Sequence, residues 1–167
     1  MIDFVSDTIV KWEVYNQEKI CANFSFDDWS LIASDIKNDE EWKVFVNENC
    51  SWVRCYVLRT CSNNREVGFV YIYNESGNFD VVSIHGGGWG KSIVSTLFYY
   101  RGMILMLRQL LNEGLKIRTT ISADNLPALR FMRSLGFVSY RNINKKVFLW
   151  INEKRLKNSA VYKRYRV

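Results

Sequence analysis

The sequence has four glycines within a few residues, between a short apolar run and a long apolar segment: Gly86, Gly87, Gly88 and Gly90. Glycine lets successive backbone N–H groups turn toward one anion, and a helix that starts just after such a loop adds the positive end of its dipole. We therefore expect the loop at residues 85–91, which ends in Lys91, to hold a phosphate group. This pattern alone does not identify the phosphate compound.

One known phosphate-binding pattern, the P-loop G-x-x-x-x-G-K-[ST] of nucleotide triphosphatases, is matched at its last three positions by Gly90, Lys91 and Ser92. Its first glycine is missing, because His85 stands there and its Cβ should obstruct the tight turn. Residues 116–124 do resemble a strand that ends in a magnesium-binding Asp. A P-loop-like nucleotide binder is therefore one alternative.

The chain has 167 residues, 48% of them hydrophobic, which suffices for one substantial core but not for two ordinary domains. We expect one domain at residues 1–152 and a basic C-terminal extension at residues 153–167. The N-terminal residues show no basic region followed by an apolar run, and Arg108 interrupts the most apolar helical segment. Neither export nor a membrane span is expected, and the predicted location is cytoplasmic.

Charge and cysteine content restrict the ligand further. The four cysteines form no C-x-x-C pair and the chain has a single histidine, so no metal site is expected. Residues 1–50 carry 4 basic and 11 acidic side chains, whereas residues 51–167 carry 19 basic and 6 acidic ones. The glycine loop lies in the basic part, which would attract a polyphosphate cofactor or nucleic acid.

Hydrophobic periodicity predicts a close succession of strands and helices. Strands are expected at residues 9–15, 52–60, 67–73, 79–85, 116–122, 137–140 and 147–151. Helices are expected at residues 25–37 and 39–47, from Ile93 to just before Gly114, and from Pro127 to just before Gly136. The second, third and fourth strands should form an antiparallel meander. The tryptophans Trp12, Trp29, Trp42 and Trp52 are expected in the core.

Two motifs carry a resemblance to a known family. The pattern N-x-x-A…L-G-F at residues 125–137 resembles a segment of the GNAT superfamily of N-acetyltransferases. That family's cofactor loop has the form [QR]-x-x-G-x-[GA], which residues 85–90 match at both glycine positions, with His85 in place of Gln or Arg. The resemblance covers residues 9–151, and its motifs lie within residues 79–137.

The resemblance implies an α+β fold of three α/β layers, in which a splayed mixed sheet, largely antiparallel, is flanked by about four helices. It implies that the strand ending at His85 parts from the strand at residues 116–122, and that acetyl-coenzyme A, as co-substrate, lies in the gap. The implied activity is transfer of an acetyl group to a primary amine by direct attack. The acidic N-terminal part would suit a cationic amine, but the class of amine substrate is left open.

The resemblance also assigns cofactor contacts. Backbone groups of the strand are expected to bind pantetheine and to polarise the thioester carbonyl, and the loop N–H groups are expected to bind the pyrophosphate. The predicted cofactor-binding residues are Val82, Ser83, Ile84, His85, Gly86, Gly87, Gly88, Gly90, Lys91 and Asn125. A second start for the phosphate loop, Arg101-Gly102, would follow a longer loop.

One departure from the family pattern affects the chemistry. The tyrosine that usually protonates the departing thiolate, seven residues after the asparagine, is Met132 in this chain, and a thioether has no proton to donate. Tyr140, Tyr99, Tyr100 or a water molecule is expected to substitute. Tyr140 and His85 are the predicted catalytic residues.

The C-terminal extension allows two interpretations. Its six basic side chains are mixed with Tyr162 and Tyr165. It is either docked, on the sheet or on a neighbouring subunit of a homodimer, or a mobile arm that binds nucleic acid. A catalytically inert GNAT-like module with a structural or nucleic-acid-binding role is therefore a further alternative.

Overall fold

The computed structural model describes residues 5–14, 53–75, 78–88 and 92–165, together with Asn38, Glu40, Glu41 and Val44. The strands are β1 (Val5–Ser6), β2 (Val10–Val14), β3 (Val53–Thr60), β4 (Glu66–Glu75), β5 (Asn78–Gly88), β6 (Lys116–Ser122), β7 (Val138–Ile143) and β8 (Lys146–Ile151). The helices are α4 (Ile93–Asn112), α5 (Leu126–Ser134), α6 (Glu153–Asn158) and α7 (Ala160–Tyr165).

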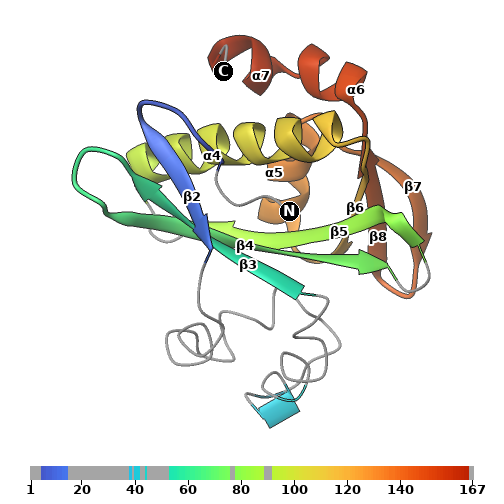
Figure 1. The fold of residues 1–167 in the computed structure, drawn as a ribbon. Coiled ribbons are helices and arrows are strands. Elements are labelled where there is room, and N and C mark those ends of the chain that lie inside the picture. The colour runs from blue at the N-terminus through green and yellow to red at the C-terminus, as the bar shows by residue number, and fades with distance from the viewer. Residues whose placement is uncertain are drawn as a thin grey trace.

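Within the described residues, the strands form one sheet in the order β1-β2-β3-β4-β5-β6-β8-β7. β5 and β6 run parallel, and the other neighbouring strands are antiparallel. The predicted α+β fold with a largely antiparallel mixed sheet is confirmed (Figure 1). The P-loop alternative stays a prediction, because Gly90 and Lys91 lie outside the described residues.

The two longer helices begin and end where the sequence predicts. At the start of α4, the Ser92 hydroxyl accepts a hydrogen bond from the backbone N–H of Ser95, and the helix ends before Gly114, whose φ is +80°. At the start of α5, the Asn125 side chain accepts the N–H of Ala128. Pro127 occupies the first turn, where its missing N–H costs nothing, and Gly136 follows the helix with φ +101°.

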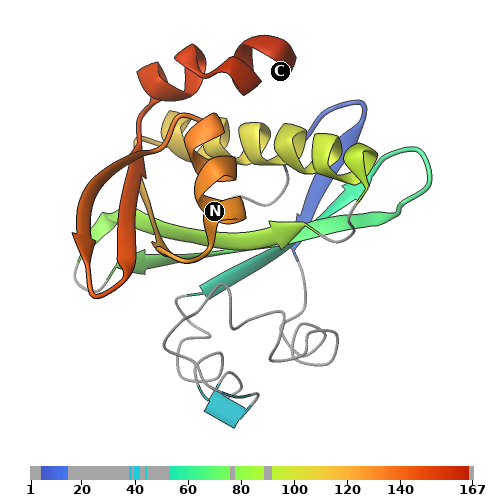
Figure 2. The ribbon, with the colours of Figure 1, turned by 180° about the vertical axis from the view of Figure 1, so that it is seen from behind.

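The core lies between α4 and the sheet, and α5 covers the same face (Figure 1 and Figure 2). Trp12 is fully buried, as predicted, and donates its indole N–H to the Gly102 carbonyl over 2.7 Å. A Cβ on Gly102 would lie 2.5 Å from both terminal carbons of Leu58, so only glycine lets α4 lie this close to β3. Trp29, Trp42 and Trp52 lie outside the described residues.

The second register for the phosphate loop, at Arg101-Gly102, is wrong. α4 is continuous through both residues, so no helix starts there. Gly102 serves the contact with Leu58, and the Arg101 guanidinium forms an ion pair with Asp7. Both residues are therefore occupied in holding α4 against the N-terminal strands.

Other elements depart from the prediction. The strand predicted to end at His85 continues to Gly88, because β4 extends equally far and pairs with it through Gly68 and Gly88. The sequence pattern does not predict β1, α6 or α7, which are too short for a periodicity to show. The first predicted helix, at residues 25–37, lies outside the described residues, and little of the helix at residues 39–47 is described.

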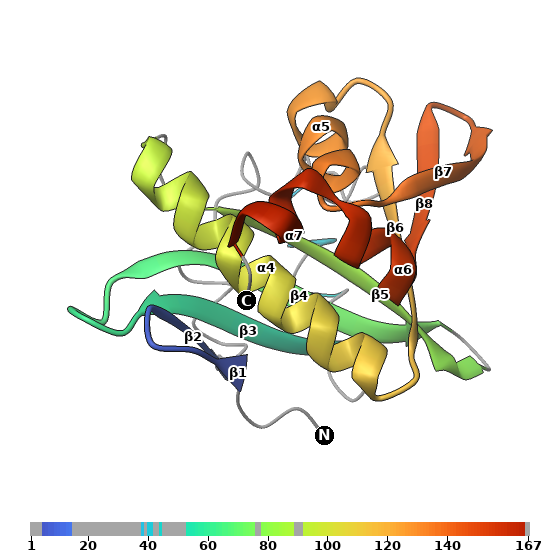
Figure 3. The same ribbon diagram turned by 90° about the horizontal axis from the view of Figure 1, so that it is seen from above.

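The C-terminal extension is docked, but on α4 and not on either of the surfaces that the first interpretation named. α6 and α7 pack on the side of α4 that faces away from the sheet (Figure 3). Leu156 of α6 is 1% exposed, and Val161, Tyr162 and Tyr165 pack against the core. The contact surface is thus a helix of the same chain and not the sheet.

We predict that Leu156→Ala destabilises the protein by about 2–4 kcal/mol, because a buried leucine leaves a cavity that its surroundings fill only partly. Chemical denaturation measures the loss. Glu153→Ala serves as the control, since the Glu153–Lys157 ion pair is exposed to solvent and should contribute little to stability. Equal effects of the two substitutions would contradict docking of α6 on α4.

Candidate functional site

β5 and β6 separate after a short common stretch. Within the described residues they pair at Val81 with Lys116, Val82 with Ile117 and Ser83 with Arg118. Beyond these pairs, β5 continues beside β4 to Gly88, while β6 continues beside β8 to Ser122. The predicted parting of the two strands is therefore confirmed, and it begins at Ile84 and Thr119.

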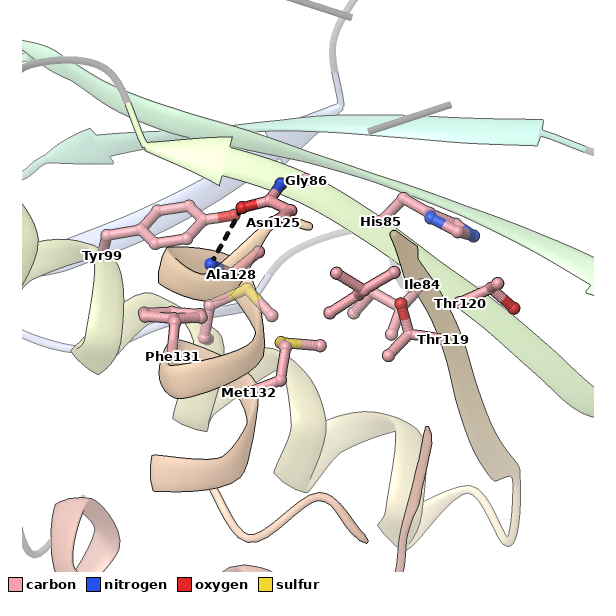
Figure 4. Close-up of a pocket in the computed structure, with 12 residues that line it drawn as sticks. Ile84, His85, Gly86, Tyr99, Thr119, Thr120, Asn125, Ala128, Phe131 and Met132 are labelled. Carbon is pink, nitrogen blue, oxygen red and sulfur yellow. Dashed lines mark hydrogen bonds between the residues drawn. The ribbon is translucent and has the colours of Figure 1, made fainter. Parts of the chain in front are cut away.

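A cavity of about 80 Å³ lies where the strands part. Its walls come from β5 and β6, and α4 and α5 close it on one side (Figure 4). The lining is mainly apolar, from Ile84, Met103, Ile121, Phe131 and Met132. Such a slot suits a narrow, flexible chain with few charges.

A wider groove of about 610 Å³ continues from this cavity and shares Gly86 and Phe131 with it. It runs between the first turns of α4 and α5, and Ser95 and Thr96 of α4 line it. Helix starts attract anions through their unpaired N–H groups and their dipole. Arg130 of α5 also lines the groove, so one cation stands beside it.

The predicted cofactor-binding residues fall into groups. Ile84, His85, Gly86 and Asn125 line the cavity, and Gly86, Gly87 and Gly88 line the groove. Val82 and Ser83 belong to the stretch that still pairs with β6, so they precede the gap. Gly90 and Lys91 lie outside the described residues.

Tyr99 explains two of the strand glycines. Its ring lies over β4 and β5, and its hydroxyl donates to the Phe69 carbonyl over 3.0 Å. A Cβ on Gly68 would come within 2.6 Å of this ring, and one on Gly86 would lie 2.8 Å from the hydroxyl and collide with the Phe69 carbonyl. A Cβ on Gly88 would meet the ring at an ordinary 3.5 Å. Burial also raises the pKa of Tyr99, so the phenol stays neutral.

We predict that Gly86→Ala and Gly88→Ala differ in stability. Alanine normally stabilises a strand relative to glycine, but at Gly86 the steric clash should dominate and cost about 1–3 kcal/mol. At Gly88 the change should stay within about 1 kcal/mol. Thermal unfolding of the two variants decides the question, and equal melting temperatures would contradict the described position of Tyr99.

His85 lies on the sheet face opposite α4. Side chains alternate along a strand, and Ile84 packs in the core beneath α4, so His85 points the other way. Its ring stacks on Tyr71 at 5.1 Å and on Tyr73 at 5.6 Å, and Nε2 lies 3.3 Å from the Tyr73 hydroxyl. Burial lowers the pKa of His85 to about 4, so the imidazole is neutral at pH 7.

The lowered pKa predicts a loss of stability in acid. The unfolded chain binds a proton at His85 near pH 6.5, whereas the folded protein does so only near pH 4. Folded-state stability from this group is therefore complete above pH 6.5 and falls as the pH drops toward 4. We expect His85→Gln to reduce this acid loss by up to about 3 kcal/mol, since the ring keeps some contact with solvent. Urea denaturation of both proteins at pH 7 and 4.5 tests it, and parallel losses would contradict the buried environment.

The predicted proton donors are not brought together. Tyr140 lies on β7, 49% exposed, with Arg118 over its ring at 5.7 Å and Phe148 at 6.2 Å, and it does not line the cavity. Tyr100 is hydrogen-bonded to Ser134 over 3.0 Å. Tyr99 lines the cavity, but its hydroxyl proton is engaged with the Phe69 carbonyl.

Two residues at the site were not predicted from the sequence. Thr119 of β6 lines the cavity, and Arg130 of α5 lines the groove. Alternation along the strand places Thr119 on the same face as Ile117 and Ile121, which is the core face. A threonine at a core position could therefore have identified it from the sequence. Arg130 lies on an exposed helix face and carries no such signal. Within the described ranges, no three His, Cys, Asp or Glu side chains gather as they would around a metal ion.

Comparison with known proteins gives matches in structure. No protein-family model matches the sequence, and the search of curated proteins found no significant match. Among solved structures, a GCN5-related N-acetyltransferase from Brucella melitensis is similar, with a TM-score of 0.68, 10% identity, and coverage of 99% of this chain and 85% of that chain.

Two further matches are complexes. A spermidine N-acetyltransferase from Vibrio cholerae with coenzyme A and spermine has a TM-score of 0.64, 14% identity, and coverage of 91% of this chain and 100% of that chain. The aminoglycoside acetyltransferase AAC(6')-Ib with coenzyme A and kanamycin has a TM-score of 0.64, 14% identity, and coverage of 95% and 99%. The resemblance found in the sequence is thus confirmed for the fold, and the chain has the GNAT fold.

Proposed function

We propose that this protein is an N-acetyltransferase that moves an acetyl group from acetyl-coenzyme A to a primary amine. The observation that carries the proposal is the parting of β5 and β6 after Ser83 and Arg118. Neighbouring strands normally satisfy each other's backbone groups, so a gap in mid-sheet needs another partner. A pantetheine arm, with two amide groups, has the shape and the hydrogen-bonding groups for that position.

The shape of the site suits the two ends of acetyl-coenzyme A. The narrow cavity would take the pantetheine arm, and the wider groove, with the start of α4 and with Arg130, would take the phosphates. Gly86 and Gly88 present no side chains, which lets a ligand approach the β5 backbone closely. Solved structures with this fold hold coenzyme A, which supports the same co-substrate here.

This orientation places the reacting end at the inner end of the cavity. The phosphates must stay at the open groove, so the thioester lies beside Ile84 and Thr119, where the strands first part. Acetyl-coenzyme A supplies the activated acyl group. The backbone of β5 at Ile84 is positioned to bind the thioester carbonyl and to stabilise its developing negative charge.

The amine would approach from the sheet face opposite α4, where His85 lies. An amine must be neutral to attack, and a neutral imidazole has a lone pair that accepts a proton. With a pKa of about 4, the His85 imidazole keeps that lone pair free of a proton throughout the physiological pH range. Because it is a weak base, it would relay a proton to solvent and not remain protonated. Tyr73, hydrogen-bonded to Nε2, fixes the ring in this position.

Amine acceptors are supported by solved neighbours that bind spermine and kanamycin. The experiment is therefore a calorimetric titration with acetyl-coenzyme A, followed by a turnover assay over polyamines, aminoglycosides, amino acids and peptide N-termini. Binding followed by turnover is the expected result. Absence of binding at millimolar concentration would overturn the proposal, and binding without turnover would favour the inert module.

We predict that Arg130→Gln weakens acetyl-coenzyme A binding about two- to fivefold, with less effect at high salt, because an exposed charge pair is weak and screened. Arg133→Gln is the matched control, since Arg133 lies one turn away and does not line the groove. Titration of the three proteins at two salt concentrations measures the difference. An equal loss in both variants would place the phosphates elsewhere.

A further inference from the structure

Thr119 presents a hydroxyl that nothing in the described protein satisfies. The residue is 3% exposed, lines the cavity, and makes no side-chain hydrogen bond within the described residues. Among described side chains, the buried polar atom with neither a partner nor access to solvent is Arg59 Nε. The Thr119 oxygen therefore opens to the cavity, and Figure 4 shows it directed into the gap toward Ile84.

A hydroxyl on a residue that is 3% exposed, with no partner in the described protein, carries a cost unless water or a ligand in the cavity satisfies it. Valine would fill the same space in a β-strand without that cost, so packing alone does not account for the hydroxyl. Its position explains it: Thr119 is the first residue of β6 after the pairing with β5 ends. This is the inner end of the cavity, where the reacting end of a bound acyl thioester would lie.

We propose that the Thr119 hydroxyl donates a hydrogen bond to the thioester sulfur and stabilises the thiolate as it departs, an inference that rests on the proposed acetyl transfer. The other hydroxyls near the site do not compete for this role. The Tyr99 hydroxyl donates to the Phe69 carbonyl, and Tyr100 and Tyr140 do not line the cavity. Thr120 lines it as well, but alternation along β6 turns its side chain to the opposite sheet face. Met132, which lines the cavity and is 7% exposed, has no proton to give.

The step balances without an oxidant or a metal. The amine nitrogen bonds to the carbonyl carbon, the carbon–sulfur bond breaks, and its electron pair goes to sulfur. The proton lost from nitrogen leaves on the face of His85, and the thiolate later takes a proton from water. Thr119 keeps its own proton, because an alcohol is far less acidic than a thiol, and it acts as a hydrogen-bond donor to the charge that forms.

The geometry supports separate roles for the two sheet faces, one for the amine and one for the departing sulfur. Thr119 faces α5, since it is buried and alternates with the half-buried Arg118 and Thr120 of the other face, whereas His85 faces the opposite side. The amine would therefore arrive on one side of the thioester and the sulfur would be held on the other. This arrangement lets attack and departure proceed without crowding.

The first test needs no acceptor. The thiol of bound coenzyme A is titrated by its thiolate absorbance in the wild type, Thr119→Val and Thr119→Ser. A hydrogen bond to the charged form lowers a pKa, so the bound thiol in the wild type and in Thr119→Ser should titrate about one unit or more below that in Thr119→Val. The same titration in all three proteins would overturn the role of Thr119. Failure of coenzyme A to bind any of them would overturn this inference and the proposed function together.

The second test is turnover with the best acceptor. Thr119→Val should lower kcat about tenfold or more, with KM for acetyl-coenzyme A nearly unchanged and the melting temperature not lowered, and Thr119→Ser should retain most of the rate. Met132→Tyr added to Thr119→Val should restore part of the rate, because a phenol would then reach the sulfur from α5. A wild-type rate in Thr119→Val, or a loss that follows KM or stability alone, would overturn the inference and leave the proposed acetyl transfer standing.

Discussion

The parting of two parallel strands is the constraint on which the rest of this structure depends. β5 and β6 pair over three residues and then follow different neighbours, so backbone groups in the centre of the sheet lose their partners. Such groups are costly when buried, and a cavity lies where they lose their partners. The separation defines the cavity and sets which residues stand at its inner end. In the proposed function it also gives the two sheet faces different chemical roles.

Helix α5 covers the gap between β5 and β6 on one face of the sheet. It packs on α4 through Phe131, whose ring lies 5.3 Å from that of Tyr99 and 4.4 Å from that of Tyr100. Leu129 and Leu135 of the same segment are buried in the core. Because α5 follows directly after β6, this contact lies beside the gap between β5 and β6. The same helix contributes Met132 to the cavity and Arg130 to the groove.

The glycines of β5 can serve packing or ligand binding, and the sequence motif does not distinguish these two roles. Gly86 is required by the tyrosine that lies over it, and it also leaves room for a ligand at the strand edge. Gly88 lines the groove but has space for a methyl group. The helix start that follows contributes two small polar residues, Ser95 and Thr96, to the groove. One cluster of glycines thus serves packing first and, in the proposed function, cofactor binding second.

Local sequence signals determined much of this protein. Apolar alternation defined β6 to the residue, Gly114 and Gly136 marked helix ends, and Asn125 with Pro127 marked a helix start, because caps and turns depend on side chains within a few positions. Tertiary structure alone decided the rest. It extended β5 to Gly88 through its pairing with β4, and it folded the C-terminal extension onto α4. It also left Tyr140 outside the cavity and turned the Thr119 hydroxyl into it. Those outcomes depend on which segments far apart in the sequence come into contact. The free energy of such contacts depends on both segments, so no short stretch of sequence predicts it.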